Sequence, residues 1–131
     1  MDAAQGRKIL VLHEDPAWGD IFRRILAKCR DEVKFIPNGR EGLEAAQQER
    51  PDIIFIYLWT PGLNAFEFYA QLHQTDILQN IPVVFYGAMP AERAYPMIRP
   101  LQVAGYLLQP FALDDLIEVR NAVLNGEAYF P

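Results

Sequence analysis

The sequence predicts an α/β fold, with a parallel sheet of about five strands between two layers of helices. Short apolar runs rich in Val, Ile and Leu alternate along the chain with longer segments whose apolar residues recur at helical spacing. The run at residues 53–58 is apolar throughout, as expected for a central strand that helices cover on both faces. Because strands that alternate with helices require parallel crossovers, a three-layer sandwich follows.

The first half of the chain predicts two strand–helix units. Residues 8–12 are a short run of branched apolar residues, typical of a strand. Apolar residues then recur at helical spacing as far as Cys29, and Pro16 suits the first turn of this helix, where its missing N–H costs nothing. A second strand is predicted at residues 33–36, before a polar helix at about residues 40–49.

The second half continues the alternation, with one irregular segment. The predicted elements are a strand, a helix, two more strands and a last helix, at residues 53–58, 66–72, 82–86, 105–108 and 113–126. Pro90, Pro96 and Pro100 stand between the last two strands. An interior proline removes a backbone hydrogen bond and costs a helix about 3 kcal/mol. We therefore expect the helix in this segment to be short or kinked.

The composition is that of one globular domain over residues 1–131, with a core at 7–126 and a C-terminal tail at 127–131. The chain is 51% apolar and 22% charged. Its net charge of −5 argues against binding of nucleic acid, which takes a basic face. There is neither a membrane-spanning apolar run nor a leader segment, which predicts a cytoplasmic protein. Cys29, the one cysteine, is expected to be a small core residue.

Several short motifs occur in order along the chain. His13-Glu14-Asp15-Pro16 comes after the first predicted strand, and Pro61-Gly62 comes after the third. Ala104-Gly105-Tyr106-Leu107-Leu108 leads into Pro110-Phe111 before the last helix. In order and spacing these motifs resemble the receiver domain of bacterial response regulators, of the chemotaxis-regulator kind. The resemblance covers residues 7–126.

The resemblance implies a flavodoxin-like (βα)5 fold with sheet order 2-1-3-4-5 and an active cleft at the switch point between the first and third strands. Members of the family act in two-component phosphorelay pathways, in which a histidine kinase phosphorylates an aspartate in this cleft. Five residue types carry that chemistry. They are two acids after the first strand, the acceptor aspartate, a hydroxyl residue after the fourth strand, and a lysine before the Pro-Phe pair.

This chain departs from the family pattern at most of these positions. The acid pair is His13 and Glu14, and the acceptor position is Tyr57, whose phenol is neutral at cellular pH. The hydroxyl position is Gly87 and the lysine position is Gln109. The resemblance therefore implies a degenerate receiver, or pseudo-receiver, without a phospho-acceptor aspartate. No catalytic residue is expected.

The altered cleft predicts weak binding of a cation at most. Magnesium prefers several carboxylate oxygens in near-octahedral geometry, and Glu14 and Asp15 are the acids left to bind it. Because neighbouring residues at a strand end point in different directions, we expect no cofactor and no functional magnesium site. Tyr57 is expected to fill the cleft; the alternative is that it accepts a phosphate ester from a tyrosine kinase.

Aromatic residues elsewhere are candidates for a contact surface. Trp59 follows the acceptor position and is either exposed to a partner or part of a capped core. Tyr106 matches the aromatic residue whose rotation reports phosphorylation in the family, and it is either half-buried or an interface anchor. With Tyr95 and Arg99 it belongs to an expected face made by the fourth helix, the fifth strand and the last helix. This face is a candidate homodimer interface.

Three functions stay open from the residues alone. The first, favoured by an intact scaffold with an altered cleft, is a phosphorylation-independent module that is not an enzyme. It would bind a signalling protein such as a histidine kinase or an output protein. The second is a phosphorylatable receiver that uses Glu14 or Asp15. The third is a small-ligand sensor on the same fold, although phosphate sites after a first strand are rich in glycine or hydroxyl groups, which this acidic segment is not.

Overall fold

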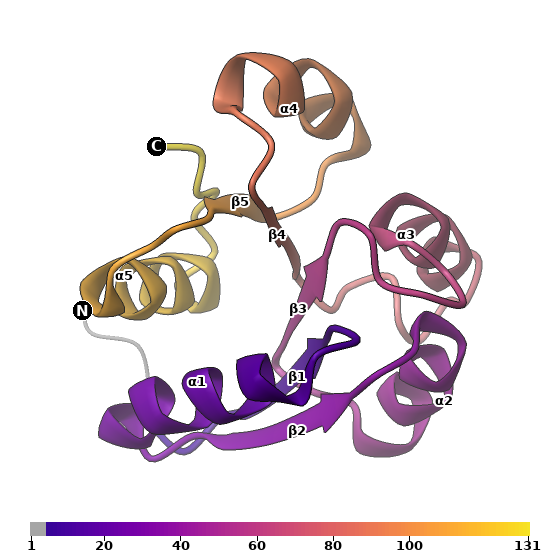
Figure 1. Ribbon diagram of the computed structural model, residues 1–131. Helices are drawn as coiled ribbons and strands as arrows, with labels where there is room; N and C mark the ends of the chain where they lie inside the picture. Colours follow the sequence, from indigo (N-terminus) through magenta and orange to yellow (C-terminus); the bar gives the residue numbers. More distant parts are fainter. Residues whose placement is uncertain (1–4) are drawn as a thin grey trace.

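Residues 5–131 are described by a computed structural model, in which a parallel sheet is covered by helices on both faces (Figure 1). The sheet has five strands in the order β2-β1-β3-β4-β5, which confirms the order that the resemblance implied. From β1 to β5, the strands span Lys8–Leu12, Glu32–Ile36, Ile53–Tyr57, Val83–Gly87 and Gly105–Leu108.

Between residues 5 and 131, five α-helices and two short 3-10 helices connect the strands. From α1 to α5, the helices span Pro16–Leu26, Gly39–Glu49, Ala65–His73, Ala91–Ile98 and Leu113–Leu124; the 3-10 helices η1 and η2 span Ala27–Cys29 and Arg99–Leu101. Helices α1 and α5 pack on one face of the sheet, and α2, α3 and α4 contribute to the core on the other (Figure 1). The predicted three-layer α/β sandwich is confirmed.

The sheet separates two hydrophobic cores, and β3 contributes to both. Ile54 and Ile56 belong to the core under α2 and α3, whereas Ile53 and Phe55 belong to the core under α1 and α5. All four side chains are fully buried. This burial on both faces explains why the run is apolar throughout instead of alternating.

The proline-rich segment forms a short helix. Pro90 precedes α4, Pro96 lies inside it, and Pro100 falls in η2, which continues the chain. The helix has 8 residues, so the expected shortening is confirmed. Only Ala94 and Ile98 of α4 are buried, and most of its surface faces away from the core.

Several boundaries differ from the predicted ones by one to three residues, and two of these differences change the element in which a buried residue lies. Strand β3 ends at Tyr57, and Leu58 lies in the following turn, where it is nevertheless fully buried in the core under α2 and α3. Helix α1 ends at Leu26, so Cys29 lies in η1. The cysteine is buried there, as the sequence predicted.

A buried ion pair joins α5 to the residue before β2. One guanidinium nitrogen of Arg120 lies 2.7 Å from Oδ1 of Asp31, and its Nε lies 2.8 Å from Oδ2. The two side chains are 1% and 0% exposed. The backbone N–H of Arg7 also donates to Oδ1 of Asp31, at 3.0 Å. This pair lies at the amino ends of the strands, away from the expected cleft.

Candidate functional site

The carboxyl ends of three neighbouring strands define the candidate site. His13 directly follows β1, Tyr57 ends β3, and Gly87 ends β4. The connections of the sheet change direction between β1 and β3, and open α/β sheets bind their ligands at such a point. The structure therefore brings together the residues that the resemblance placed in the cleft.

His13 lies in a stack of aromatic rings and not at an open ligand position. Its imidazole is 7% exposed, and the ring centroid lies 4.1 Å from that of Tyr57. The rings of Trp18 and Tyr86 lie 5.8 Å and 5.9 Å away. The backbone N–H of Asp15 donates to Nδ1 of His13 at 2.9 Å, so this nitrogen carries no proton in the structure.

This environment gives His13 a pH-dependent effect on stability. Burial lowers its pKa below the ordinary value of 6.5, against the opposing charges of Asp15 and Glu14. The unfolded chain therefore binds the proton more readily than the folded one, so His13 lowers stability as the pH falls below about 6.5. We expect the parent to lose more free energy of unfolding than His13→Asn between about pH 8 and pH 5. Urea unfolding measures this, and equal losses would contradict a buried neutral imidazole.

The two acids after β1, Glu14 and Asp15, are exposed. Asp15 caps α1 by accepting the backbone N–H of Ala17 at 2.9 Å. Within residues 5–131, no three His, Cys, Asp or Glu side chains gather as metal ligands do. The donor set does not fit the magnesium ion that the family implies, because an imidazole and a phenol stand where carboxylates are needed.

Gly87 is enclosed by the turn that follows the acceptor position. A Cβ atom added there would lie 2.8 Å from Cδ1 and 3.1 Å from Cγ of Leu58. Leu58 therefore fills the volume that a hydroxyl side chain would need at residue 87. The packing of Leu58 against Gly87 thus fits a residue without a side chain at this position.

Tyr106 is an internal residue, which corrects its assignment to an exposed surface. Its side chain is 1% exposed, and its hydroxyl donates to the backbone oxygens of Met89 and Gly87 at 2.8 Å and 3.1 Å. Burial raises the pKa of Tyr106 to about 12. The ring is therefore neither half-buried nor an interface anchor.

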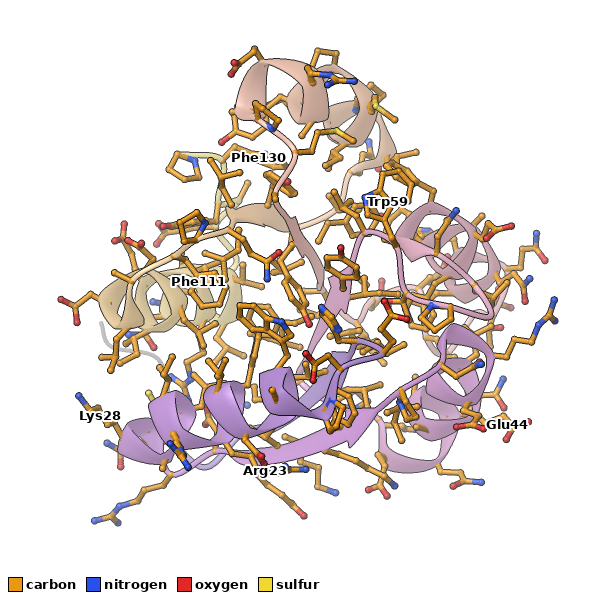
Figure 2. All side chains as sticks on the ribbon, in the orientation of Figure 1. Arg23, Lys28, Glu44, Trp59, Phe111 and Phe130 are labelled. Carbon is orange, nitrogen blue, oxygen red and sulfur yellow. The ribbon has the colours of Figure 1, made fainter. Side chains whose placement is uncertain are left out.

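The other proposed surface residues lie in two places. Trp59 is 53% exposed, and its ring centroid lies 6.5 Å from that of Phe66 on α3 (Figure 2). The capped-core alternative for Trp59 is therefore wrong. Tyr95 and Arg99 contact Phe130 of the C-terminal segment, so part of the candidate homodimer face is covered by the chain itself.

A shallow depression marks the mouth of the cleft. It is lined by one face of the aromatic stack and by the β4–α4 and β5–α5 loops, with residues His13, Trp18, Tyr57, Ala88, Gln109 and Pro110. Gln109 thus lies at the cleft, where the resemblance placed it. Its amide offers hydrogen bonds but no positive charge.

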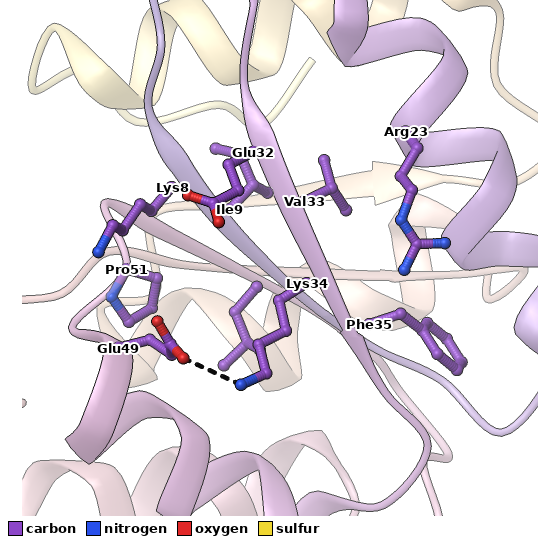
Figure 3. Close-up of a pocket in the computed structure, with 10 residues that line it drawn as sticks. Lys8, Ile9, Arg23, Glu32, Val33, Lys34, Phe35, Glu49 and Pro51 are labelled. Atoms are coloured by element: carbon purple, nitrogen blue, oxygen red, sulfur yellow. Dashed lines mark hydrogen bonds and ion pairs between the residues drawn. The ribbon is translucent and has the colours of Figure 1, made fainter.

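A second depression lies at the other end of the sheet, beside β2 (Figure 3). Lys8, Glu32 and Pro51 line it near the amino ends of β1, β2 and β3. Nζ of Lys34 lies 3.0 Å from Oε1 of Glu49 across it. Lys34 and Glu49 thus pair with each other, and the depression lies away from the switch point that holds the candidate site.

Comparison with known proteins decides the family. The model of the response regulator receiver domain matches residues 9–121, which is most of the chain. The chain belongs to this family. In the described part of this receiver domain, no helix has both the length and the apolar composition needed to cross a membrane.

The relatives of this receiver domain differ in how much of their length it covers. It is 29% identical to the protein PilH of Pseudomonas aeruginosa over 91% of this chain and 98% of PilH. It is 28% identical to the response regulator MprA of Mycolicibacterium vanbaalenii, but spans only 50% of that protein. A response regulator of Chloroflexus aurantiacus has the same fold, with a TM-score of 0.85 and 18% identity over 92% of this chain and 99% of that one.

Sequence reasoning missed the aromatic residues that surround the cleft. Tyr86 packs against Tyr57 with ring centroids 5.9 Å apart, and its hydroxyl reaches the backbone oxygen of Leu12 at 3.4 Å. The ring centroids of Trp18 and Phe111 lie 5.7 Å apart. The available signal was that aromatic residues recur next to each strand end that borders the cleft.

Proposed function

We propose that this receiver domain signals without being phosphorylated, by binding another protein of a two-component pathway. Receiver domains are signalling modules that contact histidine kinases and output proteins. The observation that supports phosphorylation independence most is the contact between His13 and Tyr57, whose ring centroids lie 4.1 Å apart at the acceptor position. A phosphoryl group arriving there would meet a phenol and an imidazole instead of carboxylates.

The rest of the cleft supports the same proposal. Phosphoryl transfer to a receiver forms an acyl phosphate on a carboxylate, and cations beside the transferred group stabilise the charge that develops. Gln109 brings no positive charge, and Gly87 brings no hydroxyl. Glu14 and Asp15 lie outside the stack, and Asp15 is engaged as a helix cap. The cleft is thus built as a packed aromatic surface, and we infer that it is not an enzyme site.

Incubation of the chain with acetyl phosphate and Mg²⁺ is expected to give no phosphorylated product. Intact-mass spectrometry measures this, with an ordinary receiver domain as the positive control under the same conditions. Labelling of the parent would contradict the proposal. If that labelling were lost in Glu14→Gln or Asp15→Asn, the alternative acceptor would be established, and if it were lost in Tyr57→Phe, the phenol would be the acceptor.

A rebuilt cleft serves as the internal control for that experiment. It combines Tyr57→Asp, Gln109→Lys and Gly87→Thr with His13→Asp, and Leu58→Ala makes room for the threonine, since Leu58 lies 2.8 Å from the position of the new Cβ. We expect this variant to become labelled. The matched variant that keeps Tyr57 and carries the other four changes should stay unlabelled. Equal behaviour of the two variants would contradict the assignment of Tyr57 to the acceptor position.

A further inference from the structure

The C-terminal segment, residues 127–131, lies along the outer edge of β5. The backbone N–H of Tyr129 donates to the oxygen of Ala104, and the backbone N–H of Tyr106 donates to the oxygen of Tyr129, both at 2.9 Å. Tyr129 forms a parallel bridge with Gly105. The segment thus extends the sheet by one short pairing, beyond the last strand.

Two aromatic side chains anchor the segment. Tyr129 is 9% exposed and belongs to the core under α1 and α5. Phe130 packs edge-on against Tyr95 of α4, with ring centroids 5.4 Å apart, and the guanidinium of Arg99 lies 5.1 Å from the Phe130 ring (Figure 2). The hydroxyl of Tyr95 donates to the backbone oxygen of Pro131. Backbone pairing and side-chain contacts therefore hold the segment together.

The edge of β5 is shaped for a close-lying peptide backbone. A Cβ atom added at Gly105 would lie 2.6 Å from the backbone oxygen of Tyr129 and 3.0 Å from its Cβ. Any side chain at residue 105 would push the segment away. An edge strand otherwise presents unpaired N–H and C=O groups to other chains, and here the chain's own segment pairs with the N–H of Tyr106 and the C=O of Ala104.

We propose that the edge of β5 and the adjoining side of α4 form a binding site for an extended peptide with two consecutive aromatic residues. In this chain the site is occupied by its own residues 127–131, which close the face to other proteins. A partner with such a segment adds a strand by the same backbone pairing. It places its first aromatic residue in the Tyr129 pocket and its second between Tyr95 and Arg99.

The tether makes the bound segment a strong competitor. A segment joined by a short linker has an effective concentration on the order of millimolar. Gly126, which joins the segment to α5, has a φ of +83°, a conformation that glycine adopts without strain, and no atom lies within 4 Å of where a Cβ would be. The site is therefore closed in the free protein and opens to a partner that outcompetes the tether.

This inference rests on the proposed function only in that it names a protein partner. Its test uses no phosphodonor, so the peptide site and the phosphorylation-independent function can fail separately. The probe is a fluorescent peptide of residues 126–131, Gly-Glu-Ala-Tyr-Phe-Pro. In the full chain carrying Tyr129→Gly and Phe130→Gly, the chain's own segment lacks the two aromatic side chains that hold it in the site. Fluorescence anisotropy is expected to show at least tenfold tighter peptide binding to this variant than to the parent.

Matched variants distinguish binding of the peptide at the edge of β5 from nonspecific binding of an aromatic peptide elsewhere on the protein. Adding Gly105→Ala to the double variant should abolish binding, because the new Cβ meets the peptide backbone. The change Glu44→Gln, at an exposed residue of α2 outside the segment and its site, should leave the parent's weak binding unchanged. Equal affinity for the parent and the double variant, no binding to either, or binding that survives Gly105→Ala would each overturn the proposal.

Hydrogen exchange in the unmodified chain gives a second test that no folding defect can obscure. The amides of Tyr129 and Tyr106 pair across the outer edge, whereas the amide of Ala104 donates to Val83 in β4 at 2.8 Å. We expect the two outer amides to exchange at least tenfold faster than that of Ala104, because the segment detaches without unfolding of the sheet. Equal rates would show that the segment never opens, and the proposal would fall.

Discussion

Replacing Asp31 by asparagine is expected to lower the free energy of unfolding by about 3–5 kcal/mol, the usual cost of leaving one buried charge without its partner. The carboxylate accepts two hydrogen bonds from Arg120 and one from the backbone of Arg7. An amide has one acceptor oxygen and no charge, so the guanidinium, 1% exposed, loses its hydrogen-bonded counterion. Urea unfolding followed by circular dichroism measures the loss.

Two variants control this prediction. Asp20→Asn breaks the exposed pair with Arg23, in which the side chains are 68% and 48% exposed, and should cost no more than about 0.5 kcal/mol. The apolar double variant Asp31→Leu with Arg120→Met should lose less than Asp31→Asn, because no charge is then left buried. If Asp31→Asn cost no more than Asp20→Asn, the buried pair would not hold α5 to the sheet as described.

Replacing Phe22 by alanine is expected to cost about 3–5 kcal/mol, as for other fully buried phenylalanines. Phe22 lies on α1 and is 0% exposed. Its ring contacts Phe55 of β3 and Tyr86 of β4, with centroids 5.2 Å and 5.3 Å away. Because Tyr86 also contacts His13, the cavity lies directly beneath the aromatic stack of the cleft. The near-ultraviolet circular dichroism of the folded variant should therefore change as well.

The neighbouring position provides the comparison. Ile21 lies on the same helix but is 36% exposed, so Ile21→Ala should cost clearly less than Phe22→Ala and leave the aromatic signal unchanged. Similar losses from the two substitutions would mean that α1 does not support the stack through Phe22. If Phe22→Ala lowered the free energy of unfolding strongly but left the near-ultraviolet spectrum unchanged, Phe22 would stabilise α1 without supporting the aromatic stack of the cleft.

Local patterns predicted the fold because they report burial directly. The apolar run of β3 and the helical spacing around Phe22 each reflect which side of an element faces a core. Pro96 predicted a short α4 because its effect on a helix is local. The order of the strands came from the resemblance and not from any one of these patterns.

Features made by distant residues were not predictable from the sequence. Asp31 and Arg120 are 89 positions apart, and nothing near either residue marks it as buried. Tyr129 pairs with Gly105 through backbone atoms, which carry no sequence signal. The inward position of Tyr106 depends on acceptors at Gly87 and Met89, so its rotamer was decided only by the packing of the β4–α4 loop.

The candidate site was predicted in its composition but not in its packing. The sequence placed a tyrosine at the acceptor position and a glycine at the hydroxyl position, which is the last residue of β4. It did not show that His13 would lie against Tyr57, or that Leu58 would fill the space beside Gly87. These contacts arise because side chains from three strand ends converge. Because of these contacts, the positions that lack the family's chemical groups form a packed, largely aromatic surface.

The most direct test of the central claim is to add beryllium fluoride and Mg²⁺ to the isotope-labelled chain and to follow its amide resonances. Beryllium fluoride mimics a phosphoryl group on a carboxylate acceptor. Because His13 and Tyr57 close the acceptor position, we predict unchanged resonances for these two residues and for Gly87. Saturable shifts at these amides, arising only when fluoride, beryllium and magnesium are all present, would show a working acceptor and contradict a receiver that acts without phosphorylation.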